Sequence, residues 1–247
     1  MRIIISPAKK MIQRDDLPMD METPALIGDA EKIMHWMQRL SYSEAKTLWN
    51  CNDRIAEENF NRLQTMNLYG NLTPAIVAFE GIQYRYMAPA VFEDTMLDYV
   101  QEHLRILSGF YGVLRPMDGV TPYRLEMQAK AGVGDAKDLC AFWGRRLYDT
   151  VKDDSRLIVN LASREYSACV ERYLQPEDTF VTCTFGELSG GRVRQKGTYA
   201  KMARGEMVRY MAENQIERPE EMQRFRRLGY EFCADLSTET SYVFVRP

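Results

Sequence analysis

Polar, turn-forming residues follow three short apolar segments, residues 2–5, 75–79 and 157–161, which we predict to be buried strands. The polar residues are Ser6-Pro7-Ala8-Lys9, Glu80-Gly81 with Tyr84, and Asn160 with Ser163-Arg164-Glu165-Tyr166. Ligands of open α/β sheets bind beyond the carboxyl ends of the strands. If the three strands are parallel, these residues share one edge of the sheet, and we expect a single site there.

Two kinds of chemistry suit the residues at this edge. Ser163 stands at the N-cap position of the following helix, whose free backbone N–H groups would attract an anion. Ser6 and Lys9 are spaced so that the lysine could act as base for a serine nucleophile. Structural roles also account for these residues one at a time, with Ser163 as a helix cap, Asn160 in a turn and Lys9 as a surface lysine.

A second group of candidate residues lies between 106 and 127, where glycines, prolines and arginines alternate with apolar residues. This composition predicts a tightly specified loop, and such loops often carry function. Arg115 with Asp118, and Arg124 with Glu126, are spaced to form ion pairs that would satisfy buried charges. The segment is therefore either a functional loop or a structural network of ion pairs.

Basic residues are concentrated in one part of a chain whose net charge is −3. Residues 192–209 contain six basic residues and one acidic residue, Glu206. The basic residues are Arg192, Arg194, Lys196, Lys201, Arg204 and Arg209. A polyanionic partner would therefore meet a local patch instead of a global field. The alternative is a solvated basic face.

The remaining sequence predicts an α/β protein, with α+β as the alternative. We predict helices at 26–40, from Ser41 with its Ser-x-x-Glu capping box, at 53–66, 92–107, 137–151, 164–173 and 201–213, and a short one after Pro219. Gly190-Gly191 predicts a hairpin between strands 179–185 and 192–194, and segments 229–233 and 241–245 are predicted to pair antiparallel. Since no repeat or long linker interrupts the sequence, we predict one domain over residues 1–247 with a mixed sheet flanked by helices.

Composition disfavours several classes of protein. No unbroken apolar stretch exceeds five residues, so we expect no membrane association, because a membrane-spanning helix needs roughly 20. The N-terminal apolar core is three residues long, and a signal peptide needs roughly 7–15, so we expect a cytoplasmic protein. The five scattered cysteines are expected to be reduced thiols. With only two histidines, we expect no metal site and no cofactor.

Several short motifs, spread in order over nearly the whole chain, point to a known family. They are Ile5-Ser6-Pro7-Ala8-Lys9, Ala78-Phe79-Glu80-Gly81 with Tyr84, residues 104–118, Pro122-Tyr123-Arg124-Leu125-Glu126-Met127, Phe142-Trp143-Gly144, Asn160-Leu161-Ala162-Ser163 with Glu165-Tyr166, and Ala203-Arg204-Gly205 after Lys201. Together these motifs resemble the YaaA peroxide stress proteins of bacteria. The sequence departs from the family pattern at Ile82-Gln83, where Asp-Val is typical, and at Met202, where a second lysine often stands.

The resemblance implies an α/β fold of the family's own kind, with a positively charged cleft, a helix-hairpin-helix element and DNA binding. It also implies protection from hydrogen peroxide through limiting free intracellular iron, and so DNA damage. The hairpin that fits such an element is Leu107-Ser108-Gly109-Phe110-Tyr111-Gly112, after helix 92–107, and its backbone N–H groups would face a phosphate. Direct iron sequestration is disfavoured, since the sequence offers neither a His/carboxylate triad nor a cysteine cluster.

Two functions remain open. The first is non-specific binding of DNA phosphates at a basic cleft of a cytosolic oxidative-stress protein, with Tyr111 and Tyr123 stacking on unpaired or junction bases. Its binding residues would be Lys9, Ser108, Gly109, Tyr111, Gly112, Arg115, Tyr123, Arg124, Asn160, Ser163, Lys201 and Arg204. The second is an enzyme acting on a phosphorylated or nucleotide-like small molecule, with catalytic candidates Ser6, Lys9, Asp118, Glu165 and Tyr166. A deep pocket favours the enzyme, and a long open groove favours DNA.

Overall fold

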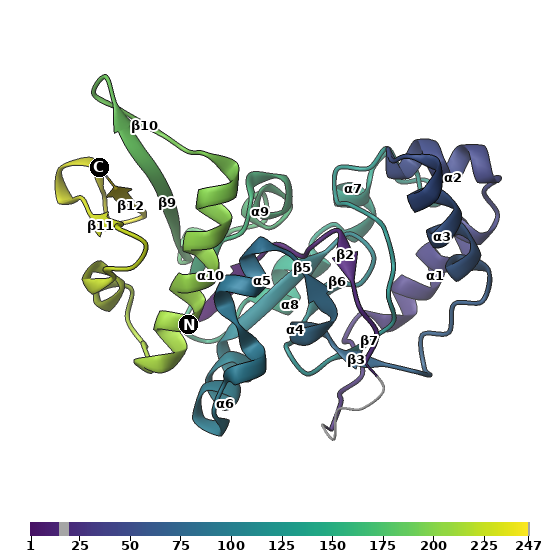
Figure 1. Cartoon of the computed structure of the whole chain (residues 1–247), viewed down its shortest axis with the longest axis horizontal. Coiled ribbons are helices and arrows are strands. Elements are labelled where there is room, and N and C mark those ends of the chain that lie inside the picture. The colour runs from purple at the N-terminus through teal and green to yellow at the C-terminus, as the bar shows by residue number, and fades with distance from the viewer. Residues whose placement is uncertain (15–19, 247) are drawn as a thin grey trace.

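A computed structural model describes residues 1–14 and 20–246 and places a mixed β-sheet at the centre of the molecule (Figure 1). The strand order is β11–β12–β9–β8–β1–β5–β6, with β10 paired to β9. The bounds are β1 Arg2–Ile5, β5 Leu104–Ser108, β6 Gly112–Leu114, β8 Leu157–Leu161, β9 Thr179–Ser189, β10 Arg192–Arg194, β11 Glu231–Phe232 and β12 Ser241–Arg246. The strands from β12 to β5 are parallel to one another, whereas β6, β10 and β11 pair antiparallel. The predicted α/β class with a mixed sheet is confirmed.

Helices flank the sheet, and three of them form a group at one end of the molecule. α1 (Ile27–Gln38), α2 (Tyr42–Trp49) and α3 (Asp53–Gln64) lie on the right of Figure 1, at the opposite end from β11 and β12. The other helices are α4 Ala75–Ala78, α5 Ile82–Met87, α6 Asp94–His103, α7 Leu139–Trp143, α8 Arg146–Val151, α9 Arg164–Glu171 and α10 Gly197–Glu213, with 3-10 turns η1 Pro89–Val91, η2 Pro219–Arg224 and η3 Ala234–Leu236. Two short antiparallel pairs lie outside the main sheet, namely β2 (Lys10–Met11) with β4 (Phe79–Glu80) and β3 (Thr73–Pro74) with β7 (Gly119–Val120).

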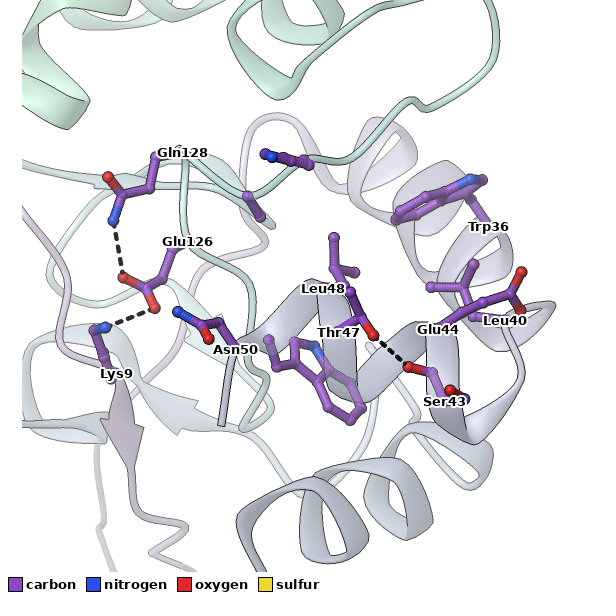
Figure 2. A pocket seen from close by; sticks show the side chains of 13 residues that line it. Lys9, Trp36, Leu40, Ser43, Glu44, Thr47, Leu48, Asn50, Glu126 and Gln128 are labelled. Carbon is purple, nitrogen blue, oxygen red and sulfur yellow. Dashed lines mark hydrogen bonds and ion pairs between the residues drawn. The ribbon is translucent and has the colours of Figure 1, made fainter. Parts of the chain in front are cut away.

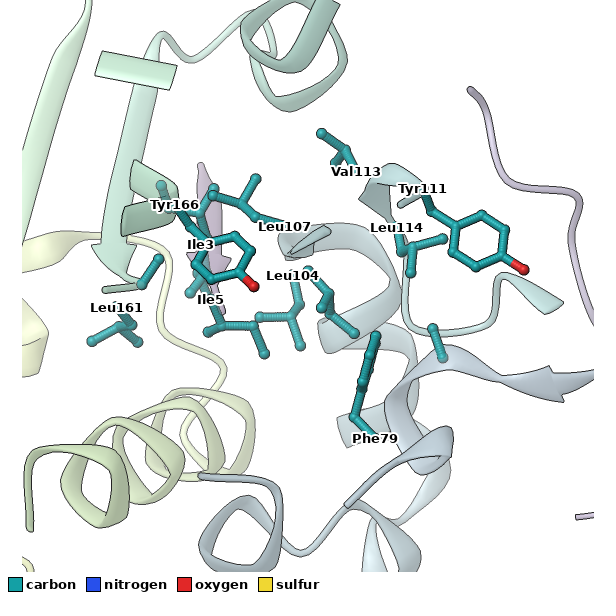
Figure 3. Packing of buried hydrophobic residues seen from close by; sticks show 14 of the residues in the cluster. Ile3, Ile5, Phe79, Leu104, Leu107, Tyr111, Val113, Leu114, Leu161 and Tyr166 are labelled. Atoms are coloured by element: carbon teal, nitrogen blue, oxygen red, sulfur yellow. The ribbon is translucent and has the colours of Figure 1, made fainter. Parts of the chain in front are cut away.

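The central strand β1 is buried on both faces. Its residues 3–5 are each 0% exposed, as expected for a strand between two parallel neighbours. Figure 3 shows residues of β1 in the apolar cluster together with Leu104, Leu107 and Leu161 of the adjoining strands. The register aligns Ile5 with Leu161 of β8, so the residues that follow these two strands emerge at the same edge of the sheet.

The predicted strand at 75–79 is wrong. Residues Ala75–Ala78 form the single helical turn α4, and Phe79 begins β4, which pairs with β2 and not with the main sheet. The first two N–H groups of this turn donate to the carbonyl groups of Asp118 and Pro116, at 2.9 and 3.0 Å. A short apolar run fits a buried helical turn as well as a buried strand. Two of the three predicted strand ends therefore share the edge of the main sheet.

The predicted helix at 92–107 is also wrong beyond His103, where α6 ends and β5 begins. All five residues of β5 are buried beside β1, and β5 pairs antiparallel with β6 after a tight turn. The segment 107–112 is therefore a β-hairpin, which corrects the placement of a helix-hairpin-helix element there. An amphipathic helix followed directly by a buried strand keeps apolar residues at helical spacing past its true end.

Ser108, Gly109, Tyr111 and Gly112 belong to this β-hairpin. The Ser108 hydroxyl accepts two N–H groups of the turn, at 3.1 and 2.8 Å. A Cβ atom at Gly109 would lie 2.8 Å from the carbonyl oxygen of Leu125, and Gly112 has a φ of +76° that favours glycine. Tyr111 is 0% exposed. All four residues thus have structural roles in the turn.

Most other predicted elements are confirmed, with shifts at their ends. The Ser41 capping box opens α2 through reciprocal hydrogen bonds with Glu44, and Gly190-Gly191 connects β9 to β10. The helix predicted at 137–151 is divided into α7 and α8 at Gly144, whose φ is +53°. No helix formed by residues 1–14 and 20–246 is long and apolar enough to cross a membrane.

Two of the five cysteines are paired, which corrects the expectation of five reduced thiols. Cys140 in α7 and Cys169 in α9 form a disulfide, with their Cα atoms 5.3 Å apart. Cys51, Cys183 and Cys233 are free. Because the two partners are 29 residues apart and meet only when α7 and α9 are placed together, their spacing in the sequence gives no sign of the pair.

The 17-residue helix α10 packs closely against α5 at Gly205. A Cβ atom at Gly205 would overlap the backbone carbonyl oxygen of Gln83 and would lie 2.9 Å from the backbone nitrogen of Met87. Glycine at this position therefore permits the close approach of the two helix backbones.

We expect Gly205→Ala to reduce the free energy of unfolding by about 2 kcal/mol. Overpacking against backbone costs on the order of 3 kcal/mol, which exceeds the gain in helix propensity of about 1 kcal/mol. Thermal unfolding should show a fall in Tm of roughly 4–8 °C. The control is Gly197→Ala on the same helix, where the new methyl group meets open space. Equal Tm values for the two variants would contradict the close contact at Gly205.

Candidate functional site

A pocket of about 560 Å³ lies beyond the end of β1, at the edge of the sheet where the sequence predicts a site. Its walls come from the residues after β1, from β4 and α5, from the 123–126 loop and from the first turns of α9 and α10. Among its lining residues are Ser6, Lys9, Lys10, Glu80, Gln83, Tyr84, Tyr123, Arg124, Glu126, Ser163, Glu165, Tyr166, Lys201 and Arg204. We call this the strand-end pocket.

The Ser6 hydroxyl holds the start of α9 against the end of β1. It accepts the N–H of Ser163 at 2.8 Å, and the two hydroxyl oxygens lie 3.2 Å apart. The Tyr84 hydroxyl donates to the Ser6 carbonyl at 3.1 Å. Lys9 instead pairs with Glu126, with Nζ 2.8 Å from Oε1, and no hydrogen bond in the described part of the chain joins it to Ser6. The contacts give Ser6 a positioning role and leave a serine–lysine dyad without geometric support.

The strand-end pocket contains more cations than carboxylates. Lys9 pairs with Glu126, and Lys10 pairs with Glu80 at 2.5 Å. The lining cations for which the described residues provide no ion pair are Arg124, Lys201 and Arg204, against one further carboxylate, Glu165. The pocket is therefore electropositive.

Two of these arginines are incompletely satisfied. The Nε atoms of Arg124 and Arg204 are buried, and neither has a hydrogen-bond partner among residues 1–14 and 20–246. Burial lowers the pKa of the Arg204 guanidinium. A buried cation without an opposite charge is costly, so an anion from outside the chain would fit between these side chains.

One face of the first turns of α10 forms the wall that carries Lys201 and Arg204. Gly197 and Ala200 also lie on this face, at the i, i+3, i+4 and i+7 spacing of neighbouring helical residues, and all four line the pocket. No N-cap side chain bonds to the first turn of α9 or of α10. Helix starts present backbone N–H groups and a positive dipole end, which adds to the positive character of the pocket.

Uncharged polar groups complete the pocket. Burial raises the pKa of Tyr84, Tyr123 and Tyr166, so each phenol stays protonated and can donate a hydrogen bond. Gln83 is 6% exposed, and its Nε2 has no hydrogen-bond partner in the described structure. Gln83 is not among the predicted site residues, because a single glutamine has no distinctive spacing. The one signal was the departure from the family pattern at Ile82-Gln83.

Several predicted site residues lie outside the strand-end pocket. Arg115 is exposed and pairs with Glu22 at 3.0 Å, and Asp118 accepts the backbone N–H of Arg115 at 2.8 Å. Asn160 is buried at the end of β8, where its Oδ1 accepts the N–H of Ala162 at 2.9 Å. The predicted residues that the pocket does bring together are Ser6, Lys9, Tyr123, Arg124, Ser163, Glu165, Tyr166, Lys201 and Arg204.

The basic residues of segment 192–209 are spread over several environments. Lys196 pairs with Glu187, and Arg209 pairs with Glu213, each at 2.7 Å. Arg192 and Arg194 are exposed on β10, Lys201 is exposed at the pocket, and Arg204 is half-buried in it. The pocket thus receives two of the six basic residues, Lys201 and Arg204.

A second cavity, of about 650 Å³, adjoins the strand-end pocket, and Lys9 and Glu126 line both. Figure 2 shows this cavity between the Lys9–Glu126 ion pair and the side chains of Trp36 in α1, Leu48 in α2 and Leu40 in the connection between these helices. The ion pair therefore separates an electropositive compartment from one with a partly apolar wall.

No group of three or more His, Cys, Asp and Glu side chains suited to a metal ion occurs within residues 1–14 and 20–246. The expectation of no metal site stays a prediction.

The fold and the pocket define a class, namely mixed α/β proteins with an electropositive pocket where the central parallel strands end. Within it, the chain belongs to the peroxide stress protein YaaA family, whose sequence model matches residues 1–236. A UPF0246 protein of Agathobacter rectalis is 57% identical over 246 residues, covering 100% of this chain and 99% of the relative. UPF0246 proteins of Pediococcus pentosaceus and Desulfitobacterium hafniense are 51% and 50% identical over 247 and 246 residues, in each case covering 100% of this chain and 98% of the relative. The resemblance found from the motifs is confirmed, and it connects the protein with peroxide stress.

The placement of Asp118 in a buried turn predicts a specific pH dependence of stability. Burial raises the pKa of Asp118 from 3.8 to about 6. The folded protein therefore binds this proton more tightly than the unfolded chain does. The resulting stabilisation is complete below about pH 4 and is lost as the pH rises through 6, by up to about 3 kcal/mol. We expect Asp118→Asn, which retains an acceptor for the Arg115 N–H, to gain stability relative to the wild type over this range.

Urea unfolding between pH 4 and pH 7 measures this difference. Asp154→Asn, at an exposed carboxylate, is the matched control and should track the wild type. A difference between Asp118→Asn and the wild type that does not change with pH would show that Asp118 is not titrating in a buried turn.

Proposed function

We propose that the strand-end pocket binds a phosphate group of a small, nucleotide-like molecule, and that the protein takes part in the peroxide stress response through this ligand. The main support for this proposal is the environment of Arg204. This residue lines the pocket half-buried, its Nε has no hydrogen-bond partner, and no carboxylate of the described residues pairs with it. Arg124 lines the same pocket with the same unpartnered Nε. The planar, multiple donors of arginine suit phosphate oxygens.

Backbone and phenol donors support an anion at the same place. The starts of α9 and α10 line the pocket without N-cap side-chain bonds, and helix starts are common phosphate sites. Tyr166 remains protonated for the reason given above, so it offers an O–H donor and no competing negative charge. The Tyr84 O–H already donates to the Ser6 carbonyl, and the Tyr123 hydroxyl lies 2.7 Å from that of Ser108. A phosphate would therefore meet donors from several walls of the pocket.

The volume of the strand-end pocket favours a small molecule over a DNA duplex as its ligand. The volume of about 560 Å³ lies within the roughly 300–1,000 Å³ typical of ligand pockets. Glu165 lines the pocket and has no ion pair in the described structure, so it is the carboxylate available as an acid or base if a reaction follows binding. Ser6 is engaged with Ser163 and serves to position the helix start.

Arg204→Met tests the proposal, because it keeps most of the side-chain volume and removes the charge. Without ligand we expect the variant to be at least as stable as the wild type, since a buried, unpaired cation has gone. Pyrophosphate or a nucleoside diphosphate at about 100 times its Kd should raise the wild-type Tm by roughly 5–10 °C. The same ligand should raise the Tm of the variant by less than about 2 °C, since the main charge contact is missing.

Arg209→Met is the matched control. It removes a cation from the same helix, but one that pairs with Glu213 and does not line the pocket, so its response to ligand should equal that of the wild type. Identical responses of the two variants, or a wild-type Tm that phosphate, pyrophosphate and nucleotides all leave unchanged, would refute a phosphate site here.

Binding of the DNA backbone is the second candidate, and exposed cations near the pocket favour it. Lys201, Arg192 and Arg194 are exposed, and the described residues provide no ion pair for them. In Figure 1 the hairpin of β9 and β10 projects from the sheet and leads into α10. A strand could place successive phosphates along these cations and one phosphate at Arg204. In this form the protein would limit iron-driven DNA damage, the role that the family resemblance implies.

A second point of contact in this candidate is the turn between α2 and α3. Three residues, Asn50-Cys51-Asn52, join these two helices. Asn50 has a φ of +45°, and Asn52 caps α3 by accepting the N–H of Ile55. Backbone N–H groups of such a turn contact phosphate without reading a base.

The salt dependence of DNA binding tests this candidate. For roughly four to six phosphate contacts, log K against log salt should have a slope of about −4 to −5. Replacing Lys201 and Arg204 by alanine should reduce the magnitude of that slope by about 2 without changing sequence preference. Thermal unfolding first establishes that the double variant is folded. A folded double variant that binds DNA with the parent's affinity and slope would exclude these cations as the DNA-binding surface.

A further inference from the structure

The Cys140–Cys169 pair plays no part in the proposed function. Its Cα atoms are 5.3 Å apart, within the roughly 4.4–6.8 Å found in disulfides. Cys140 is half-buried in α7, whereas Cys169 in α9 is 1% exposed. The pair therefore combines a solvent-accessible thiol with a buried partner that is positioned to react with it.

The sequence predicts a cytoplasmic protein, and cytoplasmic thiols are kept reduced unless an oxidant acts on them. Family membership connects the chain with peroxide stress. We propose that Cys140 and Cys169 are a reversible redox pair, reduced in the unstressed cell and joined into a disulfide by hydrogen peroxide.

The reaction balances with hydrogen peroxide as the oxidant. The Cys140 thiolate attacks one oxygen, the O–O bond breaks, and a sulfenic acid forms while the departing hydroxide takes up a proton to become water. The Cys169 sulfur then attacks the Cys140 sulfur, the S–S bond forms, and the hydroxyl of the sulfenic acid leaves with the Cys169 thiol proton as the second water. In sum two thiols lose two electrons and two protons, and peroxide becomes two waters. A dithiol reductant reverses the step through a mixed disulfide.

The disulfide connects the strand-end pocket to an anchored part of the core. Glu165 and Tyr166, at the start of α9, line the pocket, and Cys169 follows them by one helical turn. On the other side, Trp143 of α7 donates its Nε1–H to the carbonyl of Gly109 at 3.0 Å, which fixes α7 to the β5–β6 hairpin. Oxidation would therefore restrain the helix that carries part of the pocket wall. The proposal itself does not depend on which ligand the pocket binds.

The other cysteines serve as internal comparisons. Cys51 and Cys233 are half-buried like Cys140 and are free. Cys183 is buried, and burial raises its thiol pKa to about 12, which leaves little thiolate to react. Accessible thiols without a partner can be oxidised, but they cannot form this internal bond.

Peptide mapping of the full chain tests the proposal. The reduced protein is treated with hydrogen peroxide, alkylated with N-ethylmaleimide and digested with trypsin without reduction. Cleavage after lysine and arginine places Cys140 in peptide 138–145 and Cys169 in peptide 165–172. We expect these two peptides to be recovered joined, lighter by two hydrogens than their sum, with Cys51 and Cys233 alkylated. Disulfide formation should also raise the Tm by roughly 5–10 °C, because the cross-link reduces the conformational entropy of the unfolded chain. Dithiothreitol should reverse this increase.

Cys140→Ser should lose both the joined peptide and the Tm response, and Cys51→Ser, a matched control, should keep both. Two results would overturn the proposal. One is full alkylation of Cys140 and Cys169 after peroxide treatment. The other is a joined peptide in protein alkylated directly in unstressed cells, which would show a permanent disulfide. Both results come from peptide maps of the wild-type protein alone. The proposal can therefore be tested even if Cys140→Ser does not fold.

Discussion

The register between β1 and β8 is the constraint on which the rest of the structure depends. Residues 3–5 of β1 are fully buried, so a shift of one residue would exchange the faces on which they pack and would draw the flanking Arg2 or Ser6 into the core. The observed register aligns Ile5 with Leu161, and one residue later Ser6 can accept the N–H of Ser163. That hydrogen bond sets where α9 begins. The position of the strand-end pocket thus follows from the packing of three isoleucines.

One of the charges around the strand-end pocket, that of Arg204, lowers the stability of the folded protein. Lys196 and Arg209, on either side of the pocket residues of α10, each have a carboxylate partner, whereas Arg204 between them has none in the described structure and keeps a buried, unpartnered Nε. A fold under selection for stability alone would pair such a charge or replace it. Local violations of this kind are typical of functional sites, and an anion is the partner that would neutralise the unpaired charge here.

The elements that could be predicted from the sequence are those whose local pattern of apolar and turn-forming residues fits a single type of secondary structure. β1 and β8 are short apolar runs that end in polar turns, and the sequence correctly placed Ser6, Ser163 and Glu165 at their ends. The segments 75–79 and 104–108 carry similar apolar runs, but tertiary hydrogen bonds from the 116–118 loop and pairing with β1 decided their conformations. Arg115 and Arg124 likewise have similar local surroundings in the sequence. In the folded protein Arg115 pairs with Glu22, whereas Arg124 lines the pocket. This difference depends on residues far along the chain.

Packing and electrostatics meet at two consecutive residues of α10. Gly205 allows the helix to approach α5 so closely that a Cβ atom would overlap the Gln83 carbonyl oxygen, and Gln83 itself lines the pocket with an unpartnered amide. The residue before it, Arg204, is half-buried on the same helix, and burial lowers its pKa. Greater exposure to water would relieve the desolvation of the guanidinium and would weaken its attraction for an anion as the local dielectric rose. The close contact at Gly205 therefore stabilises the fold directly beside the cation on which the proposed anion site depends.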